Sequence, residues 1–210
     1  MKFYESIGPN PRLVRMFAAE KDFDLPDRVQ IDIIAGENRK QPYVSLNPRG
    51  QMPALELDDG TVLSETIVLC EYIEELKPTP VLIGTTPEER AITRMWTRRV
   101  EQAIVAPITD GFRYAEGLPL FKDRMRVIPE AADGLKAIAR DGLQWLDGEL
   151  SGREYISPNG FGMADIVLYA FLEFGASVGQ ALDPALKNLN EWYARVSARP
   201  SVEATANPGS

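Results

Sequence analysis

The fold is decided by residues 47–66, which read NPRGQMPALELDDGTVLSET. Pro53 cannot donate a hydrogen bond to a strand ladder, so it marks the first residue of a strand that alternates over 54–57. Asp59-Gly60 separates this run from a second one at 61–63, and an Asp-Gly pair between alternating runs is typical of a hairpin. The stretch therefore predicts two antiparallel strands.

A helix is expected directly after the hairpin. Residues 65–76 are amphipathic and end at Lys77-Pro78, with Ser64 as the N-cap. The Thr66 hydroxyl and the first-turn N–H groups could hold a carboxylate, while Glu65 could hold an ammonium group. Such a pair suits the head group of an α-amino acid, although an ordinary capping sequence explains the same residues.

The residues before this stretch add two strands and a helix. Lys2–Glu5 is short and aromatic, Val29–Ile33 alternates, and the segment between them has helical spacing up to about Lys21. Pro11 fits the first helical position, which makes Asn10 the natural N-cap. The order strand, helix, strand, short helical connector, strand, strand, helix predicts a mixed four-stranded sheet with helices packed against it.

Every segment after the linker at 78–84 is predicted to be helical. Thr86 caps a helix that runs from Pro87 to Tyr114 with a kink at Pro107. Further helices are expected over 123–150, 163–177 and 184–198, and an Ala/Pro/Gly/Ser-rich tail follows them. The chain therefore predicts an α/β domain followed by an all-α domain.

The composition excludes several kinds of chemistry. The 210 residues carry 23 Lys+Arg against 31 Asp+Glu, a net charge of −8, with one cysteine and no histidine. This excludes a histidine base, a histidine-held metal and an internal disulfide. The negative field disfavours nucleic acid and anionic membranes as partners. We expect a cytoplasmic protein without a metal, in which Cys70 is buried in the core.

Two turns present unpaired backbone groups. Helix N-termini favour thiolates and carboxylates, so Gly8-Pro9-Asn10-Pro11 is a candidate anion site as well as a plain cap. A cis Met52–Pro53 bond would expose the Met52 N–H and C=O to an extended peptide ligand. A trans bond would make the same segment an ordinary loop.

Taken in this order, the features resemble the cytosolic glutathione transferase family. The matching residues are Asn47-Pro48, Gln51–Leu55, Asp59-Gly60, Ser64–Ile67, Cys70–Ile73 and Gly162–Ile166. The resemblance extends to about Pro200. It implies a thioredoxin-like domain over 1–78 that binds glutathione, followed by an all-α domain over 85–210 that contributes the electrophile pocket.

By this resemblance glutathione is the co-substrate, and its parts have separate contacts. Met52 pairs with the cysteinyl backbone across cis Pro53, and Glu65 and Thr66 take the γ-glutamyl end. The glycine carboxylate falls to Asn38, Arg39 or Lys40, and Gln51. The family commonly has a histidine near Asn38 and a lysine near Gln51, so the glycine end departs from the usual pattern.

The residue at the catalytic position also differs from the usual family pattern. Most classes place Tyr, Ser or Cys near the end of the first strand, where this chain offers Asn10 first and Ser6 second. An asparagine there resembles bacterial nu-class and yeast-prion-related transferases, which stabilise the thiolate without a hydroxyl. The electrophile pocket is expected at Phe112, Arg113 and Tyr114, and the resemblance implies a homodimer.

The activity implied is that of a detoxifying transferase whose bound thiolate attacks a small hydrophobic electrophile. Two alternatives stay open, a glutathione-dependent disulfide or peroxide reductase and a non-catalytic partner-binding protein. Asp165 resembles the family's helix-start acid, but Gly162 stands where a capping box needs Ser or Thr. Half of the box remains, and the expected role of Asp165 is folding.

Overall fold

A computed structural model of the chain describes residues 1–207, which form two compact units. The first unit combines residues 1–81 with residues 200–207, and the second contains residues 82–199. The first unit contains β1 (Lys2–Glu5), α1 (Pro9–Glu20), β2 (Asp27–Gln30), a 3-10 turn (Glu37–Arg39), α2 (Tyr43–Leu46), β3 (Ala54–Glu56), β4 (Val62–Ser64), α3 (Thr66–Leu76) and α10 (Pro200–Ala204).

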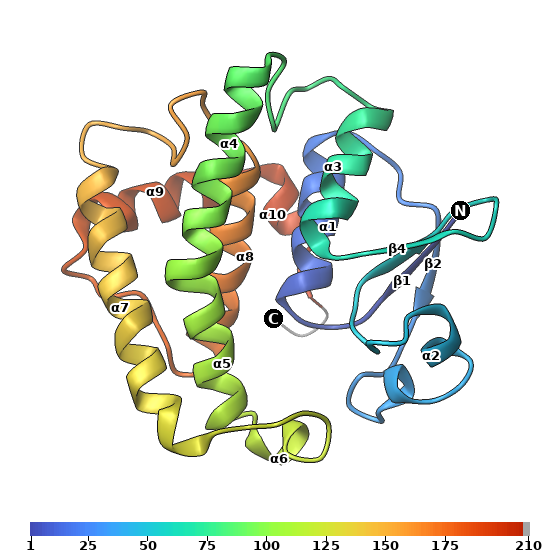
Figure 1. The fold of residues 1–210 in the computed structure, drawn as a ribbon. Coiled ribbons are helices and arrows are strands. Elements are labelled where there is room, and N and C mark those ends of the chain that lie inside the picture. The colour runs from blue at the N-terminus through green and yellow to red at the C-terminus, as the bar shows by residue number, and fades with distance from the viewer. Residues whose placement is uncertain (208–210) are drawn as a thin grey trace. The chain divides into compact units, whose positions relative to one another are not determined.

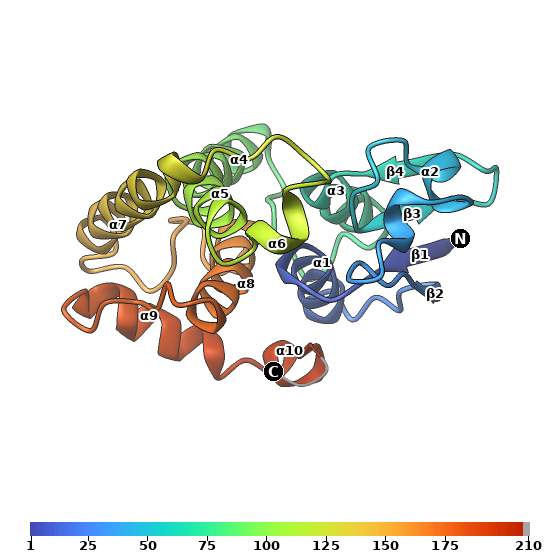
Figure 2. The ribbon, with the colours of Figure 1, turned by 90° about the horizontal axis from the view of Figure 1, so that it is seen from below.

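The four strands form one mixed sheet in the order β2-β1-β3-β4. β1 and β2 are parallel, whereas β1–β3 and β3–β4 are antiparallel. Helices α1 and α3 lie side by side on one face of the sheet, and α2 lies on the other (Figures 1 and 2). The predicted mixed four-stranded sheet is confirmed.

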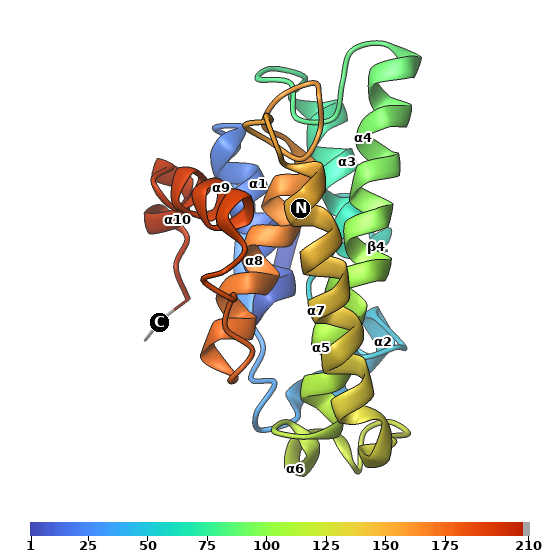
Figure 3. The ribbon, with the colours of Figure 1, turned by 90° about the vertical axis from the view of Figure 1, so that its left-hand side faces the viewer.

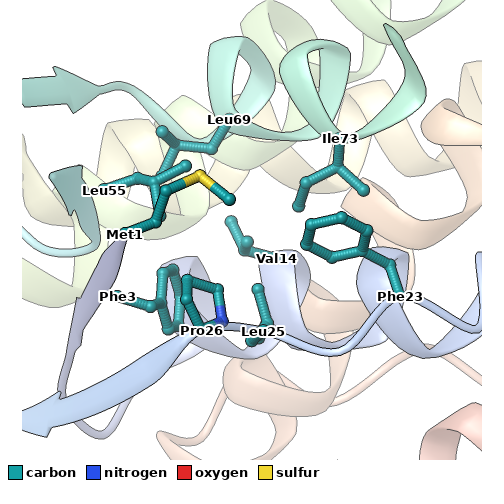
Figure 4. A pocket seen from close by; sticks show the side chains of 9 residues that line it. All are labelled: Met1, Phe3, Val14, Phe23, Leu25, Pro26, Leu55, Leu69 and Ile73. Carbon is teal, nitrogen blue, oxygen red and sulfur yellow. The ribbon is translucent and has the colours of Figure 1, made fainter. Parts of the chain in front are cut away.

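An apolar layer joins the sheet to α1 and α3. Phe3 and Leu55 from the strands meet Val14 of α1 and Leu69 of α3, and the space left among them is only about 10 Å³ (Figure 4). Burying each large apolar side chain stabilises the fold by about 1.5–3 kcal/mol. Cys70 is buried in the same helix, as predicted, and burial raises the pKa of its thiol well above the usual value.

The second strand begins and ends earlier than the pattern predicts. The structure has it over Asp27–Gln30 instead of Val29–Ile33. Asp32 is the cause, because its side chain accepts hydrogen bonds from the N–H groups of Ile34 at 2.8 Å and Ala35 at 2.9 Å. These bonds turn the chain away from the sheet edge.

The described second unit is all-helical, as predicted. It contains α4 (Pro87–Val100), a π-helical segment (Glu101–Val105), α5 (Ala106–Tyr114), α6 (Leu118–Phe121), a 3-10 turn (Pro129–Ala131), α7 (Ala132–Glu149), α8 (Met163–Ser177) and α9 (Lys187–Ser197). Figure 3 shows α7 running alongside α4 and α5. The helix predicted over 163–177 is confirmed, and α9 lies within the one predicted over 184–198.

The helix predicted from Pro87 to Tyr114 is interrupted by the π-helical segment just before Pro107. Pro107 has no N–H to give the carbonyl of Ala103, and one widened turn absorbs the missing bond. Gly142 of α7 approaches this carbonyl so closely that a Cβ there would lie 2.4 Å from it. At this interrupted turn, α7 therefore packs tightly against the backbone of the π-helical segment.

The helix predicted over 123–150 begins at Ala132 instead. Pro129 opens a 3-10 turn at 129–131, and α6 occupies 118–121, so the segment between them is not helical. None of the helices in the described chain is long and apolar enough to cross a bilayer.

The small helix α10 was not expected from the Ala-rich tail. It packs on α1, where the completely buried Arg12 donates to the Thr205 hydroxyl at 2.5 Å and to the Val202 carbonyl at 2.8 Å. The Ser201 hydroxyl donates to Glu20 at 2.5 Å. Because long-range contacts to α1 hold it, its own composition gives little sign of it.

Candidate functional site

Three segments of the first unit meet at one end of the sheet. Tyr4, Ala54 and Ser64 are in register across β1, β3 and β4. Because β3 runs opposite to both neighbours, the residues after β1, before β3 and after β4 lie at the same end. This register brings together the segments that carry Asn10, Met52 and Thr66.

The N-terminus of α1 has one free backbone donor. The helix begins at Pro9 after Gly8 at φ 112°, so the prediction of Asn10 as N-cap is wrong, and Asn10 is the second helical residue. Pro9 and Pro11 have no N–H, and the N–H of Arg12 bonds the Gly8 carbonyl at 3.3 Å. Within residues 1–207, neither the Asn10 N–H nor its side-chain amide has a hydrogen-bond partner.

The N-terminus of α3 is equally open. Ser64 was the expected cap, but it pairs with Ala54 in the ladder, so the chain turns one residue later. Glu65 becomes the N-cap at φ 72°, a conformation that a non-glycine residue rarely adopts and that marks a candidate functional position. The exposed Glu65 carboxylate and the Thr66 hydroxyl bond to nothing in the described chain, nor do the N–H groups of 66–68.

The Met52–Pro53 peptide is cis, the alternative that the sequence left open. The Met52 side chain is buried against Tyr4, Tyr43 and Ala54. Its backbone N–H and C=O make no hydrogen bond to any residue of the described part of the chain. Met52 therefore presents one donor and one acceptor beside β3.

Three buried side chains, Asn38, Tyr43 and Asn47, hold the backbone just before Met52, and we call them the brace. The Tyr43 hydroxyl donates to the Gln51 carbonyl at 2.5 Å, and the Asn47 amide donates to the same oxygen at 3.0 Å. The Asn38 amide donates to the Gly50 carbonyl at 2.6 Å. Sequence reasoning missed Tyr43 and Asn47, although an aromatic residue in a Pro-rich connector was a usable signal.

The residues expected to hold a glycine carboxylate divide into two kinds. Asn38 is 3% exposed, so its amide belongs to the brace, and its side-chain oxygen has no partner among the described residues. Arg39 and Lys40 are exposed and donate to backbone carbonyls, at 3.1 Å in each case. The Gln51 side chain is exposed and accepts from Arg49 at 3.4 Å. Arg39 and Lys40 therefore keep their charge at the surface.

The tyrosines near the site stay protonated near neutral pH. The Tyr4 hydroxyl donates to Glu56 at 2.6 Å, and burial together with this carboxylate raises the pKa of Tyr4 to about 12. Burial also raises the pKa of Tyr43 to about 12, against the hydrogen bond with Asn47. Neither phenol therefore supplies a phenolate that could take a proton from a ligand near neutral pH.

Ser6 does not belong to the same constellation. It is 5% exposed and lines an open cavity with Arg15 and Arg28, and neither Asn10 nor Met52 lines that cavity. The register of β1 gave this residue a place at the correct end of the sheet, but the cavity is formed with β2 and α10.

The candidate pocket residues of the second unit lie on α5. The Phe112 ring packs edge-on against Phe174 at 5.0 Å and Phe121 at 6.0 Å between centroids. Arg113 pairs with Asp110 at 3.1 Å and lies over the ring of Phe121. Tyr114 is half-buried and ends the helix.

Asp165 closes the N-terminus of α8. Its carboxylate accepts from the N–H of Gly162 at 3.0 Å, the N–H of Ile156 at 3.0 Å and the indole of Trp192 at 2.7 Å. Burial raises the pKa of Asp165 to about 6, and the three donors oppose that rise. Asp165 thus completes its half of the capping box and ties a loop and α9 to the helix start.

Comparison with known proteins identifies the family of the chain. Residues 7–76 match the family model of the glutathione S-transferase N-terminal domain, and residues 129–195 match that of the C-terminal domain. Glutathione S-transferase 2 of Saccharomyces cerevisiae is 34% identical, over 93% of this chain and 84% of its own length.

Two crystal structures superpose over almost the whole chain. Gtt2 from Saccharomyces cerevisiae has a TM-score of 0.91 and 33% identity, covering 98% of this chain and 100% of its own. A glutathione S-transferase domain-containing protein from Marinobacter aquaeolei VT8 has a TM-score of 0.90 and 33% identity, covering 96% of this chain and 100% of its own. The N-terminal unit is thus thioredoxin-like, and the chain belongs to the glutathione S-transferase family.

Proposed function

We propose that the chain binds glutathione at the open end of the sheet and holds its sulfur as a thiolate that attacks a small hydrophobic electrophile. The observation that carries this proposal is the set of unpaired groups at Asn10, Met52 and Thr66, which the strand register gathers at one end. A peptide with two carboxylates, one ammonium and one thiol matches these groups in kind.

The γ-glutamyl end is assigned to the start of α3. The free N–H groups of 66–68 and the Thr66 hydroxyl are donors for a carboxylate, and the helix dipole favours its charge. The exposed Glu65 carboxylate is placed one residue earlier and suits the ammonium group. Glu65 at its positive φ is the residue whose conformation a ligand would best explain.

The cysteinyl and glycine parts of glutathione are assigned to Met52 and to the residues around the brace. Met52 offers its N–H and C=O to the cysteinyl backbone, as a strand-like pairing does. Arg39 and Lys40 supply positive charge for the glycine carboxylate, with Gln51 as a neutral donor. We assign Asn38 to holding the loop rather than to the ligand, because its amide already bonds Gly50.

The thiolate is assigned to the start of α1. Its donors are the Asn10 backbone N–H and the Asn10 side-chain amide. These groups lower the thiol pKa by favouring the charged form, so the proton passes to water and no protein base is needed. The sulfur then forms its bond to the electrophilic carbon as that carbon's bond to its leaving group breaks, and the electron pair departs with the leaving group.

The remaining parts of the proposal rest on the resemblance. We assign glutathione binding to a domain over residues 1–78 and the electrophile pocket to an all-α domain over residues 85–210, of which α10 packs with the first unit. Phe112, Arg113 and Tyr114 of α5 contact the electrophile. The enzyme is a cytoplasmic homodimer with a detoxifying role and needs no metal.

The test is the pKa of the glutathione thiol in the complex, read from the ultraviolet absorbance of the thiolate across a pH series. Asn10→Ala keeps the backbone N–H and removes one donor. It should raise the thiol pKa by about 1–2, as expected for one charge-assisted hydrogen bond of about 1.5–3 kcal/mol. Asn10→Asp puts a like charge beside the sulfur and should raise it further.

Gln144→Glu is the matched control, because it adds the same charge at an exposed position of α7. It should leave the thiol pKa unchanged. Glutathione that binds with an unshifted thiol in the wild type would contradict the transferase and favour a binding protein. Absence of glutathione binding would overturn the whole assignment.

A further inference from the structure

A buried ion pair lies directly behind the start of α1. Glu5 ends β1, α1 begins at Pro9, and only residues 6–8 connect them. The guanidinium of Arg15, in the second turn of α1, donates to the Glu5 carboxylate at 2.6 Å, and both side chains are buried. The pair therefore closes the turn that leads the chain to Asn10.

Both oxygens of the Glu5 carboxylate are occupied. One accepts from Arg15 of α1, and the other accepts from the Gln30 amide at 2.8 Å and from the Nε of Arg28, both on β2. The Glu5 backbone carbonyl accepts from the N–H of Ile31 at 2.8 Å. A carboxylate bound on both sides has little freedom to turn, so Glu5 ties α1 to two neighbouring strands at once.

Net stability alone is a poor explanation for this pair. Burial lowers the pKa of the Arg15 guanidinium, and the hydrogen bond and charge of Glu5 oppose that fall. The attraction within a buried ion pair is largely offset by the lost hydration of its charges, so such a pair adds little net stability. What the pair of Glu5 and Arg15 does fix is the geometry of the entry to α1.

The opposite end of α1 has a chemically matched pair. Lys21, the C-cap of α1, is completely buried and binds the Glu74 carboxylate of α3 at 2.7 Å. A helix rises about 1.5 Å per residue, which places Lys21 about 16 Å along α1 from Asn10 and Arg15 about 7.5 Å from it. The two pairs therefore differ mainly in their distance from the proposed thiolate.

We propose that Glu5 and Arg15 are positioning residues for the proposed reaction, and that their pair holds the start of α1 so that the donors of Asn10 point at the sulfur of glutathione. The inference rests on the proposed function and adds to it the side chains that align those donors. Neither residue touches the ligand. Hydrogen bonds weaken steeply as their angle closes, so a small shift of α1 is enough to weaken the bonds to the thiolate.

The test compares Glu5→Gln with Glu74→Gln, which remove the same charge from the two buried pairs. The readout is the pKa of the glutathione thiol in the complex, followed by the ultraviolet absorbance of the thiolate. Glu5→Gln should raise this pKa by about 0.5–1, because the donors lose their alignment. Glu74→Gln should also destabilise the fold but leave the thiol pKa unchanged.

The direction of the shift separates positioning from the simple effect of charge. Without the negative charge of Glu5, the cations Arg15 and Arg28 are less neutralised, and charge alone would lower the thiol pKa. A lowered or unchanged thiol pKa in Glu5→Gln would therefore overturn the proposal. An equal rise in Glu74→Gln would contradict it too, because any loosening of α1 would then have the same effect.

Glutathione affinity gives a second measurement. A rise of about 0.5–1 in the thiol pKa corresponds to roughly three- to tenfold weaker binding of the thiolate form. Glu5→Gln should therefore bind glutathione more weakly by that factor above the thiol pKa and as tightly as the wild type well below it. A loss of affinity that is equal at both pH values would mean that Glu5 supports only the fold, and would refute the positioning role.

Arg15→Lys keeps the proposal falsifiable if Glu5→Gln does not fold. It retains the buried positive charge but loses the fork, and should raise the thiol pKa by about 0.5. Arg12→Lys is its matched control, since Arg12 is also buried on α1 but donates to the Thr205 hydroxyl and the Val202 carbonyl. Arg12→Lys should leave the thiol pKa unchanged, and an unchanged value in folded Arg15→Lys would count against the proposal.

Arg15 also donates to the Asn207 side chain at 2.6 Å, so that contact needs its own control. Asn207→Ala removes it and keeps the pair with Glu5, and should leave the thiol pKa unchanged. The wild type separates this inference from the proposed function. No glutathione binding, or an unshifted thiol in the wild type, would overturn both, whereas a shifted thiol whose pKa is the same in folded Glu5→Gln would overturn this inference alone.

Discussion

The N-termini of α4 and α8 in the second unit differ from those of α1 and α3 in the first. In the second unit, Glu89 and Thr86 cap α4 reciprocally, and Asp165 closes α8 from a fully buried position. In the first unit, α1 and α3 begin after Gly8 and Glu65 without any side-chain cap. Helix N-termini attract anions in either case, so the chain supplies its own carboxylates at α4 and α8, whereas at α1 and α3 we propose that a ligand supplies the anion.

On the proposed function, the starts of α4 and α8 stabilise the fold and the starts of α1 and α3 bind a ligand. A substitution at a closed start should cost stability and leave glutathione binding intact. A substitution at an open start should cost glutathione binding and leave stability intact. Three experiments test the distinction, and a fourth tests the side chains that hold the backbone before Met52.

The largest effect is expected at Asp165. Asp165→Ala leaves the N–H groups of Gly162 and Ile156 and the Trp192 indole unpaired in the core, and should lower the free energy of unfolding by about 3–5 kcal/mol. Denaturant unfolding measures it. Asp141→Ala, exposed on α7, is the control and should change little. A loss below about 1 kcal/mol would refute the closed-start interpretation of α8.

The pH dependence of Asp165 comes next. Its folded pKa of about 6 lies above the ordinary 3.8, so the folded state holds more protons between these values. The free energy of unfolding therefore falls as pH rises through that window, by up to about 3 kcal/mol. Compared with Asp165→Asn across pH 4–7, the wild type should gain stability as pH falls. Parallel curves for the two proteins would show that Asp165 does not titrate in this range.

A matched pair of threonines then compares the two kinds of helix start directly. Thr66→Val removes a hydroxyl from the open start and should weaken glutathione binding by about 1.5–3 kcal/mol, with little change in unfolding. Thr86→Val removes the acceptor of the Glu89 N–H and should cost about 1 kcal/mol of stability, with glutathione binding unchanged. If both variants lost stability alone, the start of α3 would be a structural cap as well.

The smallest effect concerns the brace before Met52. Tyr43→Phe keeps the buried ring and loses the hydroxyl bond to Gln51, which should raise the KM for glutathione roughly three- to tenfold with kcat unchanged. Tyr4→Phe is the matched control, since its ring packs against Tyr43 and its hydroxyl bonds Glu56 instead. An equal rise in both variants would mean that ring packing, not the brace, sets the affinity.

Local patterns predicted the elements that depend on local chemistry. The Asp59-Gly60 hairpin and α8 appear where turn residues and periodicity placed them. The predictions of Asn10 and Ser64 as N-caps were wrong. Ser64 is held in the strand ladder, and the chain enters α1 at Gly8; neither feature is visible in a capping pattern. The N-cap of α3 is the residue that leaves the sheet, and the N-cap of α1 is a glycine three residues after β1; neither is the residue best suited to cap.

Contacts between residues far apart in the sequence were the other feature that the sequence did not predict. Glu5 reads as the end of an ordinary strand, yet it is buried beneath arginines ten and twenty-three positions away. Tyr43 and Gln51 meet because a connector folds back on itself. The residues proposed for glutathione could be named from motifs, whereas the groups that hold them in place are found only in three dimensions.

The contacts of α10 have a consequence for the order in which the protein is made. Arg12 and Arg15 reach their partners at 201–207 only after the whole second unit has left the ribosome. Until then the Arg12 guanidinium lacks these partners, while Arg15 already has the Glu5 carboxylate within the first unit. The first unit, which begins to emerge first, is thus the last to have all of its residues in place.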